Sequence, residues 1–585
     1  MNKKSLFGSL LLVAMMTLTG CFTSNKTNSS SQTESSSEAS STSSESSSEV
    51  VSSSEVISSS EESSESSESS SEEESKELRL VQDDPYSLGA NYRNMRIKGS
   101  GYAGEQFTEH SRYNAELNKK EYCYAVEEVR ALVIPVDFTD YTYEVYGETE
   151  DDSREELRKI MFGSRDETAW YSLSEYYKES SFGKCNVSGD VGPWWHTGLK
   201  STDVPKNSKG KPDTEYARTI AINIQDYYRI HYDEINLAQY DANKDGLVDA
   251  LLLVYSAPIT TTGELWWAFC WSVSGAFGKY TEKGNLEGVN RFFWASFGFF
   301  YEKGYDDKGR TIYYTSEEIK NGTAVADSHT IIHEFGHVLS LPDYYVTDYA
   351  AGDYEGLGGL DMMDHNIGDH NAFSKMMYGW INPYRVAGSE GSVTQTIRST
   401  TTTGDCIIVP AVDSWNNTYL DQYLVIEFLT PEGVAELDGK VQLLGQYPLY
   451  YSIAGVRITQ VDARMGVYSS GSGGYEFTGY TYATTPPDSR SYVTFAASNT
   501  ASDSAYDKFK LIEVLPATGK TMKALAGRAT DACLYQEGDV FGEGTIFPSF
   551  KMNDTNGGKT KEFGFKISID QIVGNESATI TITRA

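Results

Sequence analysis

Residues 126–385 alternate between short apolar runs and amphipathic stretches. Residues 130–137 and 249–255 are almost continuously apolar, which predicts buried strands. Residues 213–232 repeat apolar side chains at intervals of three and four, which predicts a long amphipathic helix. Strands accompanied by helices in this way indicate a folded unit of the α/β (α+β) class.

Weaker patterns complete the picture. We expect further helices at residues 152–162, 168–179, 328–339 and 371–380, and further strands at residues 184–191, 264–272 and 291–300. After residue 385 the pattern changes to short Val, Ile, Thr and Tyr runs separated by Gly, Asn, Asp and Ser. This spacing predicts a β-sandwich-like C-terminal region over residues 386–585.

Residues 1–21 have the pattern of an export signal. Lys3 and Lys4 precede an apolar run at residues 6–18 that is too short to span a membrane as a helix. The run leads into Leu-Thr-Gly-Cys21, which resembles the lipobox of bacterial lipoproteins, where cleavage leaves the cysteine to carry lipid. An ordinary secretory signal with an incidental cysteine is the alternative.

The next two segments carry little apolar material. Residues 22–77 consist almost entirely of Ser and Glu, which cannot bury a core, so we expect a disordered tether. Residues 78–125 are polar and rich in Tyr, and we interpret them as a lead-in or pro-like segment.

Composition narrows the classes of partner. The 585-residue chain has 83 acidic residues against 49 Lys and Arg, a formal charge of -34. A surface this acidic argues against binding to nucleic acids and suits a protein that holds hard cations. None of the six cysteines forms a C-x-x-C pair, so neither a disulfide framework nor a thiolate zinc site is indicated.

The strongest chemical signal is His333-Glu-Phe-Gly-His337. Residues four apart lie on one face of a helix, so both imidazoles can bind one metal ion with Glu334 beside it. This H-E-x-x-H spacing is typical of zinc hydrolases. A catalytic zinc ion takes three protein ligands and keeps an open position. The best third ligand is Asp343, six residues beyond His337.

The residues around this motif resemble a known family. Residues 333–344, H-E-F-G-H-V-L-S-L-P-D-Y, are similar to the zinc motif of the immune inhibitor A-like metalloproteases (peptidase family M6), a metzincin-type group in which Asp replaces the third His. Residues 359–364 resemble the family's W-D-x-M stretch, which implies that Met363 is the Met-turn residue beneath the metal. Residues 375–380 match the K-x-x-x-G-W run that follows. The resemblance implies a metzincin-like zinc protease domain over residues 126–385.

Two positions depart from the family pattern. Ser340 stands where most members have Gly, and a left-handed Ser costs about 1 kcal/mol, which bears on the placement of Asp343. Leu360 stands where the family usually has Trp, which affects packing. Cys123, just before the first core strand, is expected to be an isolated core residue; a thiol that caps the metal in a latent precursor is the alternative.

The ligand set implies roles for its neighbours. Bound Zn²⁺ polarises a water molecule and the scissile carbonyl, while Glu334 takes the water's proton and passes it to the leaving amine. His365, two residues beyond Met363, lies where some metzincins carry an assisting Tyr. It is a candidate for stabilising the oxyanion, and a surface or supporting His is the other interpretation.

Residues 241–249 have the pattern of a calcium loop, with oxygen ligands at alternate positions, a Gly and a further carboxylate. The candidate ligands are Asp241, Asn243, Asp245, Leu247 and Asp249. Leu252 occupies the twelfth position, where an EF-hand has a bidentate Glu, so the loop is not a full EF-hand. A structural calcium site is the favoured interpretation, and an acidic turn is the alternative.

Together these features predict an extracellular, membrane-tethered zinc endopeptidase. We expect it to cleave polypeptides as a monomer, lipid-anchored through Cys21 at the outer face of a bacterial membrane. One alternative is a cell-surface binding or adhesion lipoprotein with a structural or vestigial metal site. Another is a glycan binder, suggested by the aromatic residues Trp194, Trp195, Trp266 and Trp267.

Overall fold

The computed structural model describes residues 76–83, four short strands between residues 96 and 122, and most of residues 127–585. The gaps after residue 127 are residues 166, 169, 243–246, 260–263, 274–287, 290, 309–310, 340, 347–352, 413, 443–447, 472–473, 482–490, 500–508 and 556–557. Cys21, Cys123 and Ser340, the signal segment and residues 22–75 of the predicted tether lie outside the described residues, whereas Lys76 and Glu77, the last two residues of that tether, are described.

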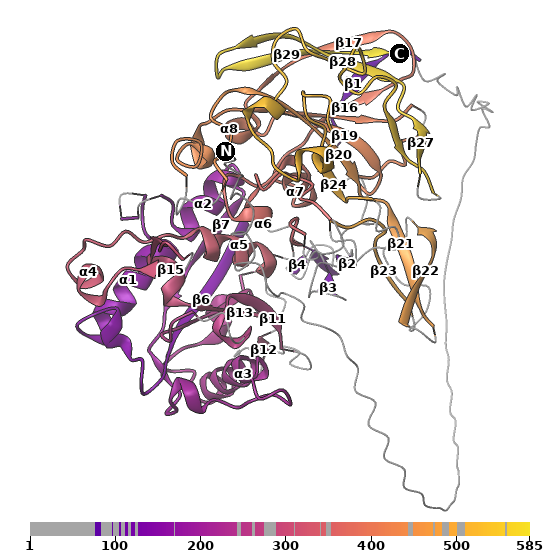
Figure 1. Ribbon diagram of the computed structural model, residues 1–585. Helices are drawn as coiled ribbons and strands as arrows, with labels where there is room; N and C mark the ends of the chain where they lie inside the picture. The colour runs from indigo at the N-terminus through magenta and orange to yellow at the C-terminus, as the bar shows by residue number, and fades with distance from the viewer. Residues whose placement is uncertain are drawn as a thin grey trace, which may run out of the picture. The chain divides into compact units, whose positions relative to one another are not determined.

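A six-stranded sheet forms the centre of the first half of the protein (Figure 1). Its strands are β6 (Glu127–Asp137), β7 (Cys185–Val191), β8 (Trp195–His196), β10 (Ala250–Tyr255), β11 (Phe269–Ser272) and β13 (Arg291–Ser296). The main order is β11-β13-β10-β6-β7, with β8 paired to β6, and only β11 runs antiparallel to its neighbour. Every residue of β10 and β13 is buried, as the continuous apolar sequence of a central parallel strand requires. The strands predicted at residues 130–137 and 249–255 are confirmed.

The two faces of this sheet bury separate cores. Successive side chains of a strand point to opposite faces, and in β6 Ala131 and Val133 enter one core while Leu132 and Ile134 enter the other. The first core also takes apolar side chains from α1 (Glu150–Phe162), α2 (Leu173–Ser180) and α5 (His329–Val338). The second core takes the apolar face of α3 (Glu215–Ile230).

Three predicted elements differ at their ends for local reasons. The helix predicted at residues 168–179 begins at Leu173, because the Ser172 side chain caps it by accepting a hydrogen bond from the Glu175 N–H. The strand predicted at residues 264–272 starts as the 3-10 turn η5 (Glu264–Trp266) before β11. The strand predicted at residues 291–300 ends at Ser296, whose hydroxyl accepts from Gly298 N–H and opens the 3-10 turn η6 (Phe297–Tyr301).

The second half of the protein is built from strands. One sheet has the order β1-β16-β18-β19-β20-β24 and a second has the order β17-β29-β28-β25. Their strands are β1 (Arg79–Val81), β16 (Tyr384–Ala387), β17 (Ser392–Arg398), β18 (Cys406–Pro410), β19 (Gln422–Leu429), β20 (Gly455–Asp462), β24 (Ile512–Val514), β25 (Val540–Phe541), β28 (Phe565–Val573) and β29 (Ser577–Arg584). Side chains from both sheets share one apolar core. The protein is thus mixed α/β, with many sheets and few helices.

The strand β1 comes from the segment interpreted as a lead-in. It lies at the edge of the first C-terminal sheet, antiparallel to β16, and Leu78 N–H donates to the Glu390 carbonyl at 2.8 Å. An ion pair between Asp83 and Arg385 closes the same contact. Residues 79–81 therefore belong to this sheet, and their neighbours Leu78 and Asp83 hold the strand in place.

The remaining elements are short. They are the strands β2 (Arg96–Ile97), β3 (Glu105–Gln106), β4 (Ser111–Asn114), β5 (Lys119–Tyr122), β9 (Leu247–Val248), β12 (Gly288–Val289), β14 (Glu302–Tyr305), β15 (Thr311–Tyr313), β21 (Met465–Gly471), β22 (Gly474–Thr481), β23 (Ser491–Phe495), β26 (Lys551–Asn553) and β27 (Lys559–Glu562), and the helices α4 (Ser316–Lys320), α6 (Met362–His365), α7 (Ala372–Met377) and α8 (Thr400–Thr403). Among the described residues, no helix has the length and apolar character needed to cross a bilayer.

The helices α5 and α6 pack at Gly336. A Cβ atom built on Gly336 would lie 2.4 Å from the Met363 sulfur, and the Met363 side chain is fully buried. Gly is the poorest non-proline helix former, so its place in α5 reflects the space that Met363 needs. This contact sets how closely the helix of the H-E-x-x-H motif lies against α6.

We expect Gly336→Ala to destabilise the protein by about 1–3 kcal/mol through overpacking, although Ala in a free helix would gain about 1 kcal/mol. Met363→Ala should cost about 2–5 kcal/mol. The double variant should lose less free energy of unfolding than the two single variants together, because the new methyl group fills part of the cavity. Urea denaturation should show a coupling of about 0.5–3 kcal/mol. Thr330→Ala, on the partly exposed face of α5, is the control. Strictly additive losses would show that the two side chains do not compete for one space.

Candidate metal centre

The structure brings together His333, His337 and Asp343. His333 Nε2 and His337 Nε2 lie 3.2 and 3.0 Å from Asp343 Oδ1. All three residues are buried, and one ligand atom of each lies within 4.8 Å of the others. Two side chains come from one face of α5 and the third from the turn beyond it, as the motif predicts.

These distances suit a tetrahedral zinc ion. Ligand atoms at bond lengths of about 2.0–2.1 Å around such an ion lie about 3.3 Å apart, close to the two N–O distances observed. The other ring nitrogens are engaged, since Nδ1 of His333 lies 2.7 Å from the Met362 carbonyl and Nδ1 of His337 lies 2.8 Å from the Leu341 carbonyl. Each Nδ1–H donates to its carbonyl, so both Nε2 atoms face Asp343. The residues present therefore fit a zinc ion.

Backbone hydrogen bonds fix the turn that carries Asp343. Leu341 N–H donates to the Gly336 carbonyl at 2.9 Å, and Tyr344 N–H donates to the Met363 carbonyl at 2.7 Å. The Asn499 side-chain amide donates to the Tyr344 carbonyl at 3.0 Å. Contacts on both sides of Asp343 thus hold the chain where its carboxylate meets the imidazoles.

The charges of the three ligands stabilise one another. Burial would lower the pKa of His337, but the charge and hydrogen bond of Asp343 outweigh it and raise that pKa to about 9. Burial would raise the pKa of Asp343, but the two imidazoles outweigh it and lower that pKa. A metal cation would take the place of the imidazole protons, so metal affinity falls in acid.

Glu334 lies beside the ligands without joining them. Its side chain is buried, and burial raises its pKa above the ordinary carboxyl value while the two imidazoles lower it. Among the described residues, Glu334 Oε2 has no hydrogen-bond partner. A buried carboxylate oxygen held free of protein donors is suited to accept a proton from a small molecule at the centre.

Tyr345 is a further residue of the site that the motif does not reveal. Its hydroxyl hydrogen-bonds to Asp343, and its ring stacks on His333 with the centroids 6.3 Å apart and the planes at 26°. Burial, followed by the negative charges of Asp343 and Glu334, raises the pKa of Tyr345 well above its ordinary value. The only sequence signal was an aromatic residue two positions after a candidate ligand.

Polar side chains from elsewhere in the chain bind carbonyl groups in the middle and at the end of α5. Arg291 donates to the His337 carbonyl, Tyr177 Oη to the Ile332 carbonyl at 2.8 Å, and Tyr378 Oη to the Leu339 carbonyl at 2.9 Å. The carbonyls of His337 and Leu339 would otherwise lack partners at the end of the helix, whereas the Ile332 carbonyl lies in its middle. The helix is fixed along its length as well as at its ligands.

His365 groups with other residues. Its Nδ1 lies 2.7 Å from Asp364 Oδ1, and its ligand atom lies within 4.8 Å of those of Asp364 and Glu355. The carboxylates of this second cluster accept backbone N–H bonds from Gly359 and Val346 at 3.0 and 2.9 Å. We interpret the cluster as support for the 343–365 segment, and a role of His365 at an oxyanion stays a prediction.

The other sequence landmarks of this region lie in the core. Met363 packs against Gly336 of the helix that carries His333 and His337, and its role as a Met-turn residue stays a prediction. Leu360, which replaces the family's Trp, is fully buried in the core that contains α5.

The calcium loop is described only at its ends, because Asn243 and Asp245 lie outside the described residues. Asp241 is buried, and Leu247 begins β9. Asp249 Oδ2 accepts from the Ala242 N–H at 3.1 Å, which places this carboxylate at the start of the loop. Calcium binding stays a prediction.

The aromatic residues behind the glycan-binding alternative are partly core residues. Trp194 and Trp266 are buried, and Trp194 Nε1 donates to Ser153 Oγ at 3.0 Å while its ring stacks on Phe297. Trp267 is exposed and Trp195 is partly exposed. Two of the four rings are therefore explained by packing.

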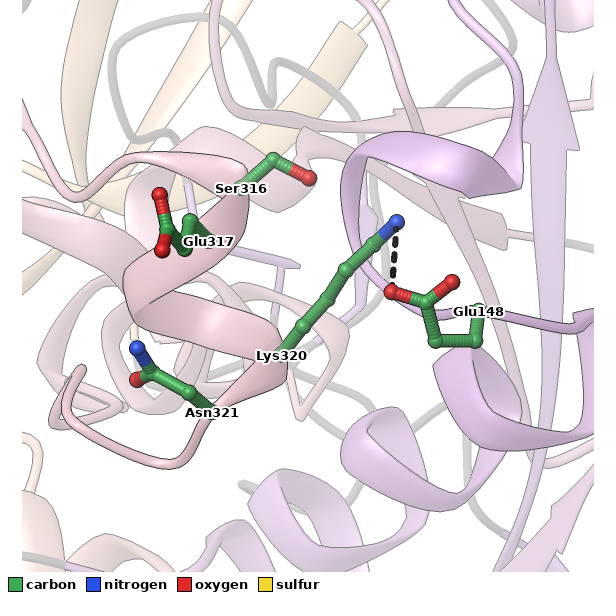
Figure 2. Close-up of a pocket in the computed structure, with 5 residues that line it drawn as sticks. All are labelled: Glu148, Ser316, Glu317, Lys320 and Asn321. Atoms are coloured by element: carbon green, nitrogen blue, oxygen red, sulfur yellow. Dashed lines mark ion pairs between the residues drawn. The ribbon is translucent and has the colours of Figure 1, made fainter.

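A surface hollow of about 480 Å³ lies at α4 (Figure 2). It is lined by Glu148, Ser316, Glu317, Lys320 and Asn321, and Lys320 Nζ pairs with Glu148 Oε1 at 3.2 Å. None of the residues singled out from the sequence lines it. The metal centre is a separate, buried site.

Part of the chain is similar to a known protein. Immune inhibitor A from Bacillus thuringiensis subsp. alesti is 24% identical over 264 residues, which make up 40% of this chain and 36% of that protein. The chain therefore covers little more than a third of that relative. No model of a protein family matches the chain. The relationship supports the resemblance to the immune inhibitor A-like metalloproteases at the level of the family.

A second histidine anchors the start of α5. Nδ1 of His329 lies 2.5 Å from Asp327 Oδ1, its Nε2 lies 3.1 Å from Asp438 Oδ1, and its ring stacks on Trp170 at 3.7 Å. Burial would lower the pKa of His329, but the charges of Asp438 and Asp327 raise it to about 10. The protonated ring thus links the helix of the metal ligands to a residue 109 positions away.

This link should depend on pH. A folded-state pKa of about 10, raised from 6.5, contributes stability that is complete below pH 6.5 and is lost as the pH rises through 10. The wild type should exceed Asp438→Asn in free energy of unfolding by a few kcal/mol near neutral pH, and this difference should shrink towards pH 10 in urea titrations. Asp203→Asn, an exposed change, should show no such trend. A difference that stays constant with pH would contradict a charged His329.

Proposed function

We propose that this protein is a zinc-dependent endopeptidase that hydrolyses peptide bonds in polypeptides, with a metzincin-like catalytic domain at residues 126–385. The proposal rests on one observation: His333, His337 and Asp343 form a buried cluster, and Glu334 lies beside them. The distant relationship to immune inhibitor A supports it.

The chemistry divides between the ion and the protein. Bound Zn²⁺ supplies Lewis acidity, which makes water more acidic and polarises a carbonyl group. Glu334 accepts the proton of the attacking water and delivers it to the nitrogen of the leaving amine. The hydrogen bonds from both Nδ1 atoms keep the imidazoles in the tautomer that presents Nε2. Because Asp343 is anionic, the ligand set is one charge less positive than three imidazoles, which places more of the proton transfer on Glu334.

The alternative is a surface binding protein with a structural zinc ion. Structural sites are normally closed by four protein ligands. Within the described part of the chain this group has three members, and a buried carboxylate lies next to them without a hydrogen bond to Oε2. Both features favour a catalytic site.

The proposal includes the surroundings suggested by the sequence. These are export, a lipid anchor at Cys21, the Ser/Glu tether over residues 22–77, a monomeric protein, and a structural calcium ion at residues 241–249. Together they describe an enzyme that acts on polypeptides outside the cell while attached to its membrane.

Glu334→Gln should lower casein cleavage by roughly 10³-fold, because the amide cannot accept the proton of water. Zinc content should remain unchanged, since Glu334 is not a ligand. Casein cleavage by the wild type should also stop when a chelator removes zinc and return when zinc is restored. Glu317→Gln, an exposed change on α4, is the matched control.

Full casein cleavage by the Glu334 variant would rule out its role as the base. A zinc-loaded wild type that cleaves no polypeptide would favour the surface binding protein instead.

Millimolar calcium should raise the melting temperature of the zinc-loaded protein by roughly 5 °C, because an ion that binds only the folded state stabilises it. Asp245→Asn should abolish this shift by removing one charged ligand from the loop. Asp307→Asn, in another exposed acidic turn, should retain it. Equal calcium shifts in all three proteins, measured by calorimetry, would speak for an acidic turn without an ion.

A further inference from the structure

Tyr345 contacts two of the three candidate ligands with one side chain. Its hydroxyl hydrogen-bonds to Asp343, and its ring lies beside the His333 imidazole with the centroids 6.3 Å apart and the planes at 26°. The residue is half-buried, whereas the adjacent Tyr344 and Val346 are buried. Tyr345 thus forms part of the wall of the metal centre, from the same turn that supplies Asp343.

Asp343 needs such a contact more than the imidazoles do. His333 and His337 are each fixed twice, by their places in α5 and by the bond from Nδ1 to a carbonyl. Asp343 lies beyond the helix, and its Oδ1 faces both Nε2 atoms. Once both Nε2 atoms bind a metal ion, they no longer hold the carboxylate of Asp343 by direct contact. A hydrogen bond from outside the ligand set then has to do so, as is usual for carboxylates that bind metals.

We propose that Tyr345 is a positioning residue of this centre, whose hydroxyl holds the Asp343 carboxylate in the orientation needed to bind a metal ion. This proposal rests on the proposed function. The hydroxyl donates to the carboxylate, which also draws negative charge away from the ligand oxygen. This partly offsets the weaker Lewis acidity that an anionic third ligand confers.

The chain provides a matched control in the next residue. Tyr344 is fully buried, and its hydroxyl lies 2.8 Å from Ser374 Oγ. Its contacts with the Asp343 turn are made by backbone atoms, which a change to Phe leaves in place. Tyr345→Phe and Tyr344→Phe therefore each remove one hydroxyl from adjacent positions, and only the first hydroxyl touches a ligand.

The test measures zinc affinity by competition with a chromogenic chelator, alongside the visible spectrum of the cobalt-substituted protein and the melting temperature of the metal-free protein. Tyr345→Phe should weaken zinc binding by about 10- to 100-fold and alter the cobalt spectrum, with the melting temperature of the metal-free protein retained. Tyr344→Phe should leave zinc affinity and the cobalt spectrum as in the wild type, even if it lowers the melting temperature.

Three results would overturn the assignment: a zinc affinity of Tyr345→Phe equal to that of the wild type, an equal loss in Tyr344→Phe, or no zinc binding by the wild type. The first result together with casein cleavage by the wild type would leave the proposed function intact. A wild type that binds zinc and cleaves no polypeptide would remove the proposed function, and the affinity ratio of the two Phe variants would still decide the role of Tyr345.

Discussion

The structure depends on burying two imidazoles and a carboxylate in one place. Each of these groups would be costly to bury alone, because a polar or charged group loses its hydration. Together they offset the cost, since Asp343 Oδ1 lies 3.2 and 3.0 Å from the two Nε2 atoms and carbonyl groups accept hydrogen bonds from both Nδ1–H groups. The arrangement is possible only if the turn that carries Asp343 keeps a fixed position relative to the helix α5. Many of the surrounding contacts fix the turn and the helix in that position.

Those contacts come from distant parts of the chain. The core beneath α5 contains apolar residues of the C-terminal strands, such as Tyr423 and Val425, as well as those of the first half. Asn499 donates to the backbone of the turn that carries Asp343. Asp438 binds His329 at the start of α5. One hydrophobic core therefore runs across residue 385, although the sequence changes its pattern there. The C-terminal strands support the site as well as extending the chain.

The parts of this picture that depend on local sequence were predictable. A helix places His333 and His337 on one face whatever surrounds it, and the apolar runs of β6 and β10 allow little besides a buried strand. The ends of elements were less predictable, because single side chains such as Ser172 and Ser296 decide them. Contacts between distant positions could not be predicted, because they produce no periodic pattern in the sequence. The link from His329 to Asp438 and the pairing of β1 with β16 join residues 109 and about 300 positions apart. The sequence also drew attention to His365 rather than Tyr345, because spacing from Met363 cannot show which way a side chain turns.

The position of β1 has a mechanical consequence. This strand is the first described element after the Ser/Glu segment, and it forms the rim of the first C-terminal sheet with Asp83 clasped by Arg385. If the Ser/Glu segment ties the protein to a membrane, as proposed, a pull on that segment would reach the folded part at this edge strand, which backbone hydrogen bonds and the Asp83–Arg385 ion pair hold in place. The helix α5, which carries His333 and His337, is not one of the strands of this sheet. Such a pull would therefore act first on the pairing of β1 with β16 and not on the candidate ligands.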